Sequence, residues 1–243
     1  MSQAKTLRAA FYHANVDIPE LKPVLARRPE ALLGFAVAAE KAIAMWERLR
    51  AVTPKSGYYP IVVADAGLLE EVAEEAAPAA ELLTLASRVD PVKWLRTKAS
   101  QGERPEGGEW PEEPQASNAF MATLDAATGK PRTDVKIVLL PTPNPWEAAA
   151  HLGFSAVNYD IEPQHHVAVH QKWFKEWGAE PVTATGDVME FRVTRPPTNR
   201  AKAKALAAEQ YAYCPDIVDQ GVGTLENLGA AIMGAPVWFF WWD

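Results

Sequence analysis

The segment 101–118 constrains the fold of this chain more than any other feature of its sequence. It reads QGERPEGGEWPEEPQASN, with three prolines, three glycines, a surplus of acidic residues and no apolar periodicity. Structureless loops of this length are uncommon inside a compact domain, and this composition is typical of linkers and surface loops. The sequence therefore predicts an N-terminal α/β region over 1–100, a linker or long loop over 101–118, and a C-terminal domain over 119–243.

Hydrophobic periodicity and helix-start signals predict the elements on either side of this segment. Before it we expect a helix over 38–49, a strand over 58–64 whose Pro60 suggests a sheet edge or the start of a strand, a helix over 68–86 interrupted at Pro78, and a helix that begins at Asp90. After it we expect a strand over 135–140, a helix from Asn144 to Gly153, an amphipathic helix over 163–178, a hairpin over 182–194, helices that begin at Thr198 and Thr224, and a strand over 237–242. This order predicts an α/β or α+β fold, with a mixed sheet flanked by helices and a Trp-rich C-terminal strand.

Composition excludes several classes of protein. Hydrophobic residues make up 48% of the chain and charged residues 23%, as in ordinary globular domains rather than disordered chains. A single cysteine excludes a disulfide framework and a multi-cysteine zinc site. Because we find neither a signal peptide nor an apolar run of the ~20 residues that a membrane helix needs, we expect a soluble, cytoplasmic protein of bacterial type that binds no membrane.

The net charge of −7 bears on whether the protein binds nucleic acids or basic proteins. Nucleic-acid-binding proteins carry basic patches, and the nearest candidate, RPPTNRAKAK at 195–204, is typical of a solvated helix start. We therefore expect no nucleic acid as a partner. An acidic surface suits a basic protein partner, or it serves only solubility. The sequence has no phosphate-binding or dinucleotide-binding motif, so we expect no cofactor, although a small ligand stays open.

Two histidines, His166 and His170, lie one helical turn apart on the apolar face of the helix expected over 163–178. Two side chains at this spacing can bind a metal ion, but the glutamate of the zinc-protease motif is missing between them. The alternatives are two core histidines satisfied by hydrogen bonds, or a polar binding or catalytic site. We expect no metal, because two histidines need further ligands.

Further polar residues lie at the end of the helix that begins at Thr198. Gln210 shares the inward face of this helix with apolar residues, and a buried amide must find partners. Asp216, Asp219 and Gln220 follow on an expected loop. These side chains either point into a cleft or cap neighbouring backbone groups.

Two more features could carry chemistry. Asp187 in the hairpin turn and Glu190 on the next strand could do acid–base work or bind Mg²⁺, or they are ordinary turn and surface acids. Cys214 could be a nucleophile paired with one of the histidines, although a lone cysteine on an apolar helix face is more often a small buried residue.

One long motif resembles a known family. The stretch EQYAYCPDIVDQGVGTLENLGAAI, followed by the terminal VWFFWWD, is similar to the bacterial family of domains of unknown function numbered 4253. The resemblance covers about 135–243, and the stretch HVAVHQKWFKEWGAE and the hairpin with Asp187 and Glu190 fit it as well. It implies a fold unit that ends in a Trp-rich strand, and it implies no established activity, substrate or cofactor.

Two classes of function follow from these features. The first is a non-catalytic binding protein, such as an immunity or accessory protein that masks a protein partner. The alternative is a hydrolase-like enzyme of unknown reaction that uses His166, His170 and carboxylates around the 209–220 segment. The two differ in geometry, because an enzyme or ligand site needs the candidate side chains to converge on one open pocket.

Overall fold

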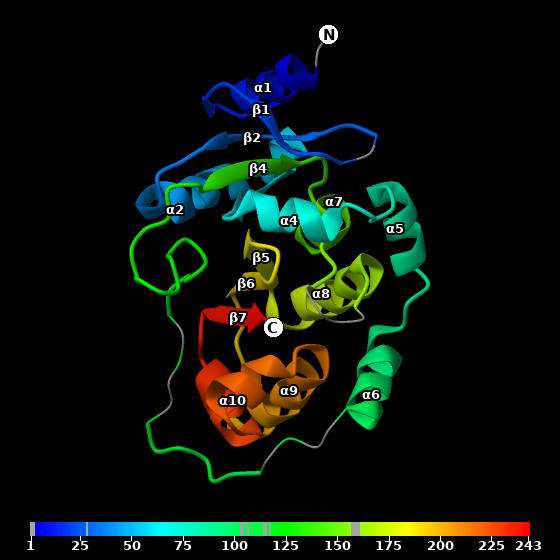
Figure 1. Cartoon of the computed structure of the whole chain (residues 1–243), viewed down its shortest axis with the longest axis vertical. Helices are drawn as coiled ribbons and strands as arrows, with labels where there is room; N and C mark the ends of the chain where they lie inside the picture. The colour runs from blue at the N-terminus through cyan, green and yellow to red at the C-terminus, as the bar shows by residue number, and fades with distance from the viewer. Residues whose placement is uncertain are drawn as a thin grey trace.

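A computed structural model describes residues 3–27, 29–102, 105, 107–113, 116, 118–156 and 161–243. Within these ranges seven strands form one sheet in the order β1-β2-β4-β3-β5-β6-β7 (Figure 1). The strands are β1 (Lys22–Leu25), β2 (Leu32–Ala36), β3 (Tyr59–Val63), β4 (Lys136–Leu140), β5 (Ala179–Ala184), β6 (Val188–Val193) and β7 (Val237–Trp241).

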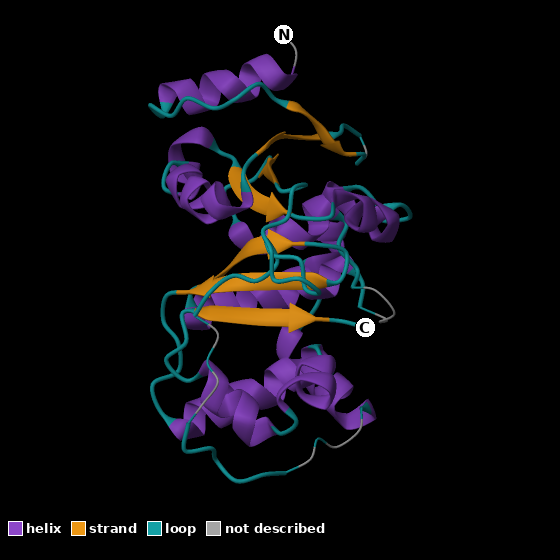
Figure 2. Cartoon of the chain, turned by 60° about the vertical axis from the view of Figure 1, so that its left-hand side comes forward, coloured by secondary structure: helices purple, strands orange, loops and turns teal. Residues whose placement is uncertain are grey.

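The helices pack around this sheet, and the expected architecture of a mixed sheet with flanking helices is confirmed. They are α1 (Gln3–His13), α2 (Ala39–Arg50), α3 (Thr53–Ser56), α4 (Ala66–Ala73), α5 (Ala79–Ala86), α6 (Pro91–Gln101), the 3₁₀ turn η1 (Pro145–Glu147), α7 (Ala148–Leu152), α8 (Pro163–Trp177), α9 (Arg200–Tyr213), the π-helical turn η2 (Ile217–Val222) and α10 (Leu225–Ile232). Figure 2 shows the sheet running along the molecule, with α1 beyond one end and the pair α9 and α10 beyond the other. In the described ranges no helix has the length and apolar character needed to cross a bilayer.

The sheet interleaves strands from the two sides of the segment 101–118. β4 lies between β2 and β3 and pairs antiparallel with both, with Val138 opposite Gly34 on one side and Ile61 on the other. β3 in turn pairs parallel with β5, while β5, β6 and β7 form an antiparallel run. The expected division between 1–100 and 119–243 therefore separates hydrogen-bonded neighbours in one sheet.

Part of the expected linker packs against the rest of the chain. The backbone N–H of Gly108 donates to Glu226 Oε2 at 3.0 Å, and the guanidinium of Arg200 lies 5.0 Å from the centre of the Trp110 ring. Several positions of the segment, among them 103, 104, 106, 114, 115 and 117, lie outside the described residues. The described part of the segment thus runs over α9 and α10 as a surface loop.

Local signals set most helix boundaries. Asp90 Oδ1 accepts hydrogen bonds at 3.0 Å from the backbone N–H groups of Val92 and Lys93, so it caps α6 as expected. Gly178 ends α8 with φ +63°, and a Cβ there would lie 2.0 Å from Thr194 Oγ1. A side chain at this position would be strained by the left-handed backbone conformation, and it would also require the Thr194 hydroxyl to move.

Three local expectations differ from the structure. Asn144 does not cap its helix, because its side chain donates to Glu147 Oε1 at 2.9 Å, and the first turn is 3₁₀. Asn199 rather than Thr198 caps α9, accepting from the N–H of Lys202 at 3.0 Å. The expected loop after Cys214 contains the π-helical turn η2. Of the two alternatives for Pro60, the start of a strand is confirmed, because Pro60 is the second residue of β3, and β3 lies inside the sheet.

The C-terminal strand supplies much of the aromatic core. Trp238 and Phe240 on β7, and Trp242 directly after it, pack against rings of α8, and all three are at most 1% exposed. The rings of Trp173 and Phe240 are stacked with 5.4 Å between centroids. Burial of large aromatic rings gives a Trp-rich strand its stabilising role, and the expected C-terminal strand is confirmed.

Candidate functional site

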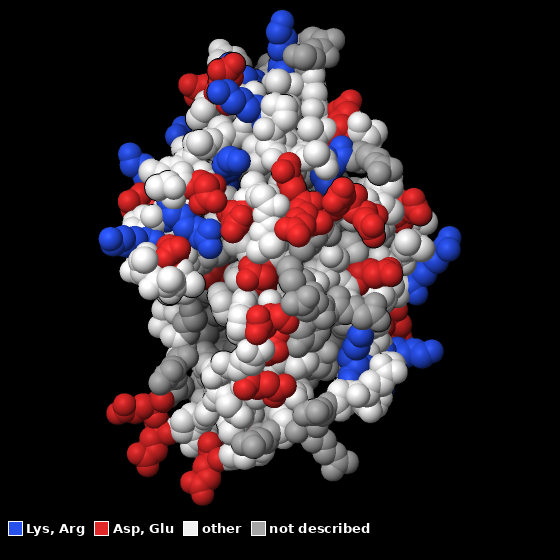
Figure 3. All heavy atoms as spheres, viewed as in Figure 1, with Lys and Arg blue, Asp and Glu red and all other residues white. Residues whose placement is uncertain are grey.

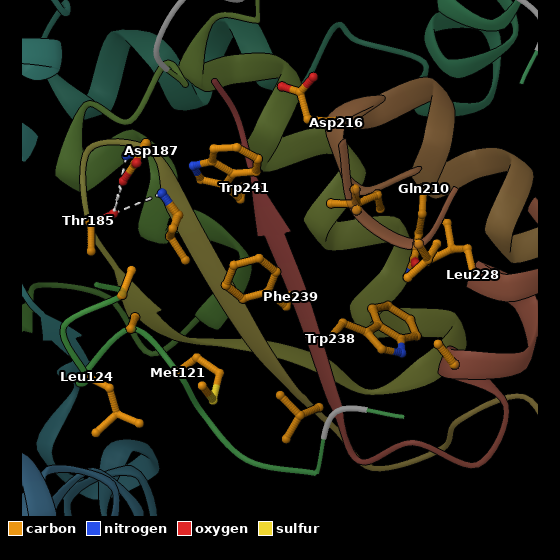
Figure 4. Close-up of a pocket in the computed structure, with 18 of the residues that line it drawn as sticks. Met121, Leu124, Thr185, Asp187, Gln210, Asp216, Leu228, Trp238, Phe239 and Trp241 are labelled. Carbon is orange, nitrogen blue, oxygen red and sulfur yellow. Dashed lines mark hydrogen bonds between the residues drawn. The ribbon is translucent and has the colours of Figure 1, made fainter. Parts of the chain in front are cut away.

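A cavity of about 680 Å³ lies over the outward face of β7 (Figure 4). We call it the β7 cavity. Its floor is formed by Phe239 and Trp241, one wall by the loop 121–132 with Met121, and the opposite wall by α9, η2 and α10 with Leu228. Its volume falls within the range of small-molecule pockets. Most lining side chains are apolar, and a few polar groups lie among them.

Three of the eight candidate residues line the β7 cavity: Asp187, Gln210 and Asp216. The structure places the other five elsewhere: His166, His170 and Glu190 are fully buried, while Asp219 and Gln220 are exposed on η2. The convergence that an acid–base or nucleophilic site needs is therefore partial, because the histidines are separated from the carboxylates that line the cavity.

Gln210 is the polar residue of the inner wall. It stands on α9, is 1% exposed, and its Nε2 has no hydrogen-bond partner among the described residues. Figure 4 shows its side chain extending from α9 toward Trp238, next to Leu228. A buried N–H group without an acceptor costs stability. The Nε2 of Gln210 can therefore donate a hydrogen bond to a guest that enters the cavity.

Asp216 joins η2 to the C-terminus. Its Oδ2 accepts from the backbone N–H of Asp243 at 2.9 Å, and its Oδ1 accepts from Gln220 Nε2 at 3.2 Å. The exposed Asp219 accepts from the hydroxyl of Tyr211 at 3.2 Å. Both acids of this segment therefore accept hydrogen bonds from neighbouring groups of the chain. Asp216 lines the cavity, but each of its carboxylate oxygens already accepts a hydrogen bond.

Asp187 shapes the turn between β5 and β6. Its Oδ1 accepts from Thr185 Oγ1 at 2.6 Å, and that hydroxyl oxygen in turn accepts from the N–H of Val188 at 2.9 Å. This bonding is typical of a tight turn. The side chain also faces the cavity mouth (Figure 4).

Glu190 holds the loop that forms one wall of the cavity. Its carboxylate accepts from the backbone N–H groups of Met121 at 2.5 Å and Ala122 at 3.1 Å, and from Thr183 Oγ1 at 2.6 Å. Burial raises the pKa of this carboxyl group, although the three donors oppose the shift. Glu190 therefore binds the loop from beneath, while Asp187 binds Thr185 in the hairpin turn. The two acids do not form the acid–base or Mg²⁺-binding pair considered above.

His166 and His170 share one hydroxyl group. Tyr213 Oη lies 2.5 Å from His166 Nδ1 and 2.8 Å from His170 Nε2. Since a hydroxyl has one hydrogen, it donates to one ring and accepts an N–H from the other. The outer nitrogens, His166 Nε2 and His170 Nδ1, are buried without a partner among the described residues.

Burial keeps both imidazole rings neutral. It lowers the pKa of His170 to about 3 and places the pKa of His166 well below its usual value. The rings lie among aromatic side chains, with Phe191 4.8 Å from His170 and Phe154 5.0 Å from His166 between ring centroids. A general base needs access to substrate and a pKa near the working pH, and neither ring has these properties here.

Cys214 is a buried core residue. Its Sγ donates to the backbone carbonyl of Trp241 at 3.0 Å, and burial raises the pKa of the thiol well above its usual value. The reactive form of cysteine is the thiolate, so this thiol is poorly suited to nucleophilic attack. Among the residues that the structure describes, no group of three or more His, Cys, Asp or Glu side chains is placed to hold a metal ion.

Sequence reasoning missed the apolar residues of the β7 cavity. Met121 and Leu124 come from a loop with no motif, so nothing in their sequence indicates a wall. Phe239 and Trp241 were recognisable as one face of an alternating strand, but the sequence left open whether that face was covered.

In a comparison with known proteins, the C-terminal part of the chain matches a family model. Residues 136–243 match the model of the family "domain of unknown function (DUF4253)". The matched part includes β6, β7, α9 and α10, whereas the loop 121–132 precedes it. Neither a curated protein nor a solved structure matches the chain.

Proposed function

We propose that this chain is a binding protein without catalysis of its own, and that the β7 cavity is its binding site. One observation carries the proposal: a largely apolar cavity is lined by Gln210, whose Nε2 has no hydrogen-bond partner among the described residues, while the imidazole rings of His166 and His170 lie outside the cavity. Apolar walls with few placed polar groups are typical of binding pockets. The absence of a usable base or nucleophile at the described walls favours binding over turnover.

The mouth of the cavity suits a protein partner. Met121 is 49% exposed and Phe239 37% exposed, and both line the cavity. Exposed apolar residues around a pocket are typical of protein interaction sites, and a buried anchor side chain from one partner often dominates such an interface. The lining carries three acids, Asp125, Asp187 and Asp216, against one cation, Arg132, and this negative balance favours a basic partner. An immunity or accessory protein that masks its partner would bind in this way.

A cavity-filling variant tests the site. Ala231 lines the cavity on α10, so Ala231→Trp should occupy it without adding charge. The neutral apolar dye N-phenyl-1-naphthylamine serves as the probe, and we expect a saturable rise in its fluorescence with the native protein. The rise should be lost in Ala231→Trp and kept in Ala205→Trp, which places the same side chain on the exposed face of α9. Equal binding by all three proteins would exclude the β7 cavity.

The same pair of variants tests the protein partner. A partner captured from the native host should bind the native protein and Ala205→Trp, and should be lost with Ala231→Trp. Thermal melting of both variants shows whether they are folded. A partner that binds Ala231→Trp as well as the native protein would mean that the interface lies elsewhere.

The hydrolase alternative has one supporting observation, since Asp187 and Asp216 both face the cavity. It predicts turnover of simple esters such as 4-nitrophenyl acetate that depends on these acids. We expect rates no higher than buffer alone, in the native protein and in Asp187→Asn. Turnover that Asp187→Asn abolishes would favour the enzyme over the binding protein.

A further inference from the structure

A second cavity, of about 620 Å³, lies between α4, α5 and the N-terminal turn of α8. Its polar lining consists mainly of acids and one amide: Glu71, Glu74, Glu75, Glu162 and Gln164. We call it the acidic cavity. Figure 3 shows acidic side chains gathered on this face of the molecule, over the position of α4.

Gln164 leaves a buried acceptor without a donor. The residue is 8% exposed, its Nε2 donates to Glu162 Oε2, and its Oε1 has no hydrogen-bond partner among the described residues. A carboxylate only accepts hydrogen bonds, so the amide nitrogen must face Glu162 and the orientation of the amide is settled. The oxygen therefore lacks a donor that a guest can supply.

The carboxylates of the acidic cavity form no ion pairs with the lysines and arginines that the structure describes. Within the described ranges no lysine or arginine forms an ion pair with Glu71, Glu74, Glu75 or Glu162. Arg27 lies beneath the same turn, but its guanidinium donates to backbone carbonyls, among them those of Ala73, Ala76 and Ala77. The cavity thus presents several acceptors and a concentrated negative charge, and a ligand must bring donors and positive charge.

The remaining lining favours a guest with an aliphatic stem. Leu82 and Pro163 are buried, and Leu85 is 37% exposed at the rim. A bare metal ion would fill only a small part of about 620 Å³ and would leave these apolar groups uncovered. A guanidinium group carries five donors in a planar fork, and its alkyl stem packs on apolar surface.

We propose that the acidic cavity binds an arginine side chain presented by a basic protein partner. Carboxylates at the C-terminal end of α4 and at the N-cap of α8 contact the guanidinium. The Oε1 of Gln164 accepts a hydrogen bond from one of its N–H groups, and the alkyl stem lies against Leu82 and Pro163. The site is separate from the β7 cavity and does not rest on the function proposed for it.

The probes are two blocked amino acids of equal shape, N-acetyl-arginine N-methylamide and its citrulline counterpart. Citrulline keeps the stem and replaces the guanidinium with a neutral urea. We expect the arginine probe to shift amide resonances of α4 and α8 and to bind at least about tenfold more tightly than citrulline, since hydrogen bonds between charged groups are the stronger ones. Equal binding of the two probes would overturn the proposal.

Matched variants separate a built site from general attraction to an acidic protein. Glu71→Gln and Glu40→Gln each remove one exposed negative charge, but Glu40 lies on α2 and does not line the cavity. We expect several-fold weaker arginine binding in Glu71→Gln and in Gln164→Leu, and native affinity in Glu40→Gln. Equal losses in Glu71→Gln and Glu40→Gln would mean general charge attraction and contradict the site.

Two further outcomes would also contradict it. Calcium ions that bind the native protein and displace the arginine probe stoichiometrically would indicate a cation site instead. Native arginine affinity in Glu71→Gln would remove α4 from the contact. Glu71 is exposed, so its variant keeps the fold even if Gln164→Leu does not. Dye binding in the β7 cavity should be unaffected throughout, which keeps this test independent of the first proposal.

Discussion

Glu190 Oε1 accepts a hydrogen bond of 2.5 Å from the backbone N–H of Met121, a residue 69 positions earlier in the chain. The bond joins the loop 121–132 to the sheet. It places Met121 at the mouth of the β7 cavity, opposite α10. A buried carboxylate thus ties one wall of this cavity to the sheet.

Replacing Glu190 should detach the loop 121–132 from the sheet. In Glu190→Ala the N–H groups of Met121 and Ala122 and the hydroxyl of Thr183 lose their acceptor, and each buried unsatisfied group costs about 1–3 kcal/mol. We expect a lower free energy of unfolding in urea and faster tryptic cleavage after Arg132, because Pro131 protects the bond after Lys130 from trypsin. The exposed Glu20→Ala serves as the control. Native stability and native cleavage in Glu190→Ala would mean that the loop is held by other contacts.

The neutral histidines should make stability depend on pH. The pKa of His170 is about 3 in the folded protein, against 6.5 as its ordinary value. Between these values the unfolded chain binds more protons, so the free energy of unfolding falls as the pH decreases below 6.5, by up to about 1.4 kcal/mol per pH unit for each such histidine. The stability is fully present above pH 6.5.

Urea denaturation at about pH 7 and about pH 5 measures this dependence. The difference between the two conditions should shrink in His170→Gln and stay unchanged in His13→Gln, because His13 is exposed at the end of α1. Tyr213→Phe should lower stability at both pH values, since it removes the hydroxyl that both rings share. A full pH dependence in His170→Gln would show that other groups cause it.

Asp216 and Asp219 should differ in their contribution to stability. Asp216 is 5% exposed and accepts from Gln220 and from the backbone of Asp243. We expect Asp216→Ala to cost about 1–3 kcal/mol, as for a buried acceptor whose donors are left unpaired. Asp219→Ala should change stability by less than about 0.5 kcal/mol, as for an exposed position. Equal losses in thermal melts of the two variants would contradict this assignment.

The fragment 119–243 should not fold cooperatively alone. In the full chain β4 has β2 on one side and β3 on the other, and β5 pairs with β3. Without 1–100 the buried residues of β4, such as Ile137 and Val138, would face water. We expect no cooperative thermal transition by near-UV circular dichroism, and recovery of one when the fragment 1–100 is co-expressed. A sharp transition in 119–243 alone would support the domain division that the segment 101–118 suggests.

Local sequence signals predicted the elements well where the bonds that form them are local. Asp90 caps α6 through N–H groups two and three positions away, and Thr224 caps α10 through that of Asn227. Gly153 and Gly178 end their helices with positive φ. The errors at Asn144 and Thr198 are equally local, because the Asn144 amide donates to Glu147 instead of capping, and Asn199 caps α9 in place of its neighbour Thr198.

The candidate site could be predicted only in part. The sequence indicated that Gln210 faces inward and that the two histidines lie on the apolar face of α8, because helical periodicity determines both. It gave no indication that Tyr213 would lie between the histidines, since that contact joins α8 to α9 across more than forty positions. It also gave no reason to expect Glu190 beneath a loop rather than at a hairpin surface.

The sequence by itself determined where most helices and strands begin and end, which faces of them are apolar, and that the last strand is rich in tryptophan. The tertiary structure alone decided that β4 inserts between β2 and β3, that the histidines are withdrawn from the cavity, and that Met121 lies over Glu190. The difference is physical. Caps, turns and periodicity depend on groups within a few residues, whereas strand order and cavity walls depend on which distant apolar surfaces pack together, and many pairings are compatible with the same local pattern.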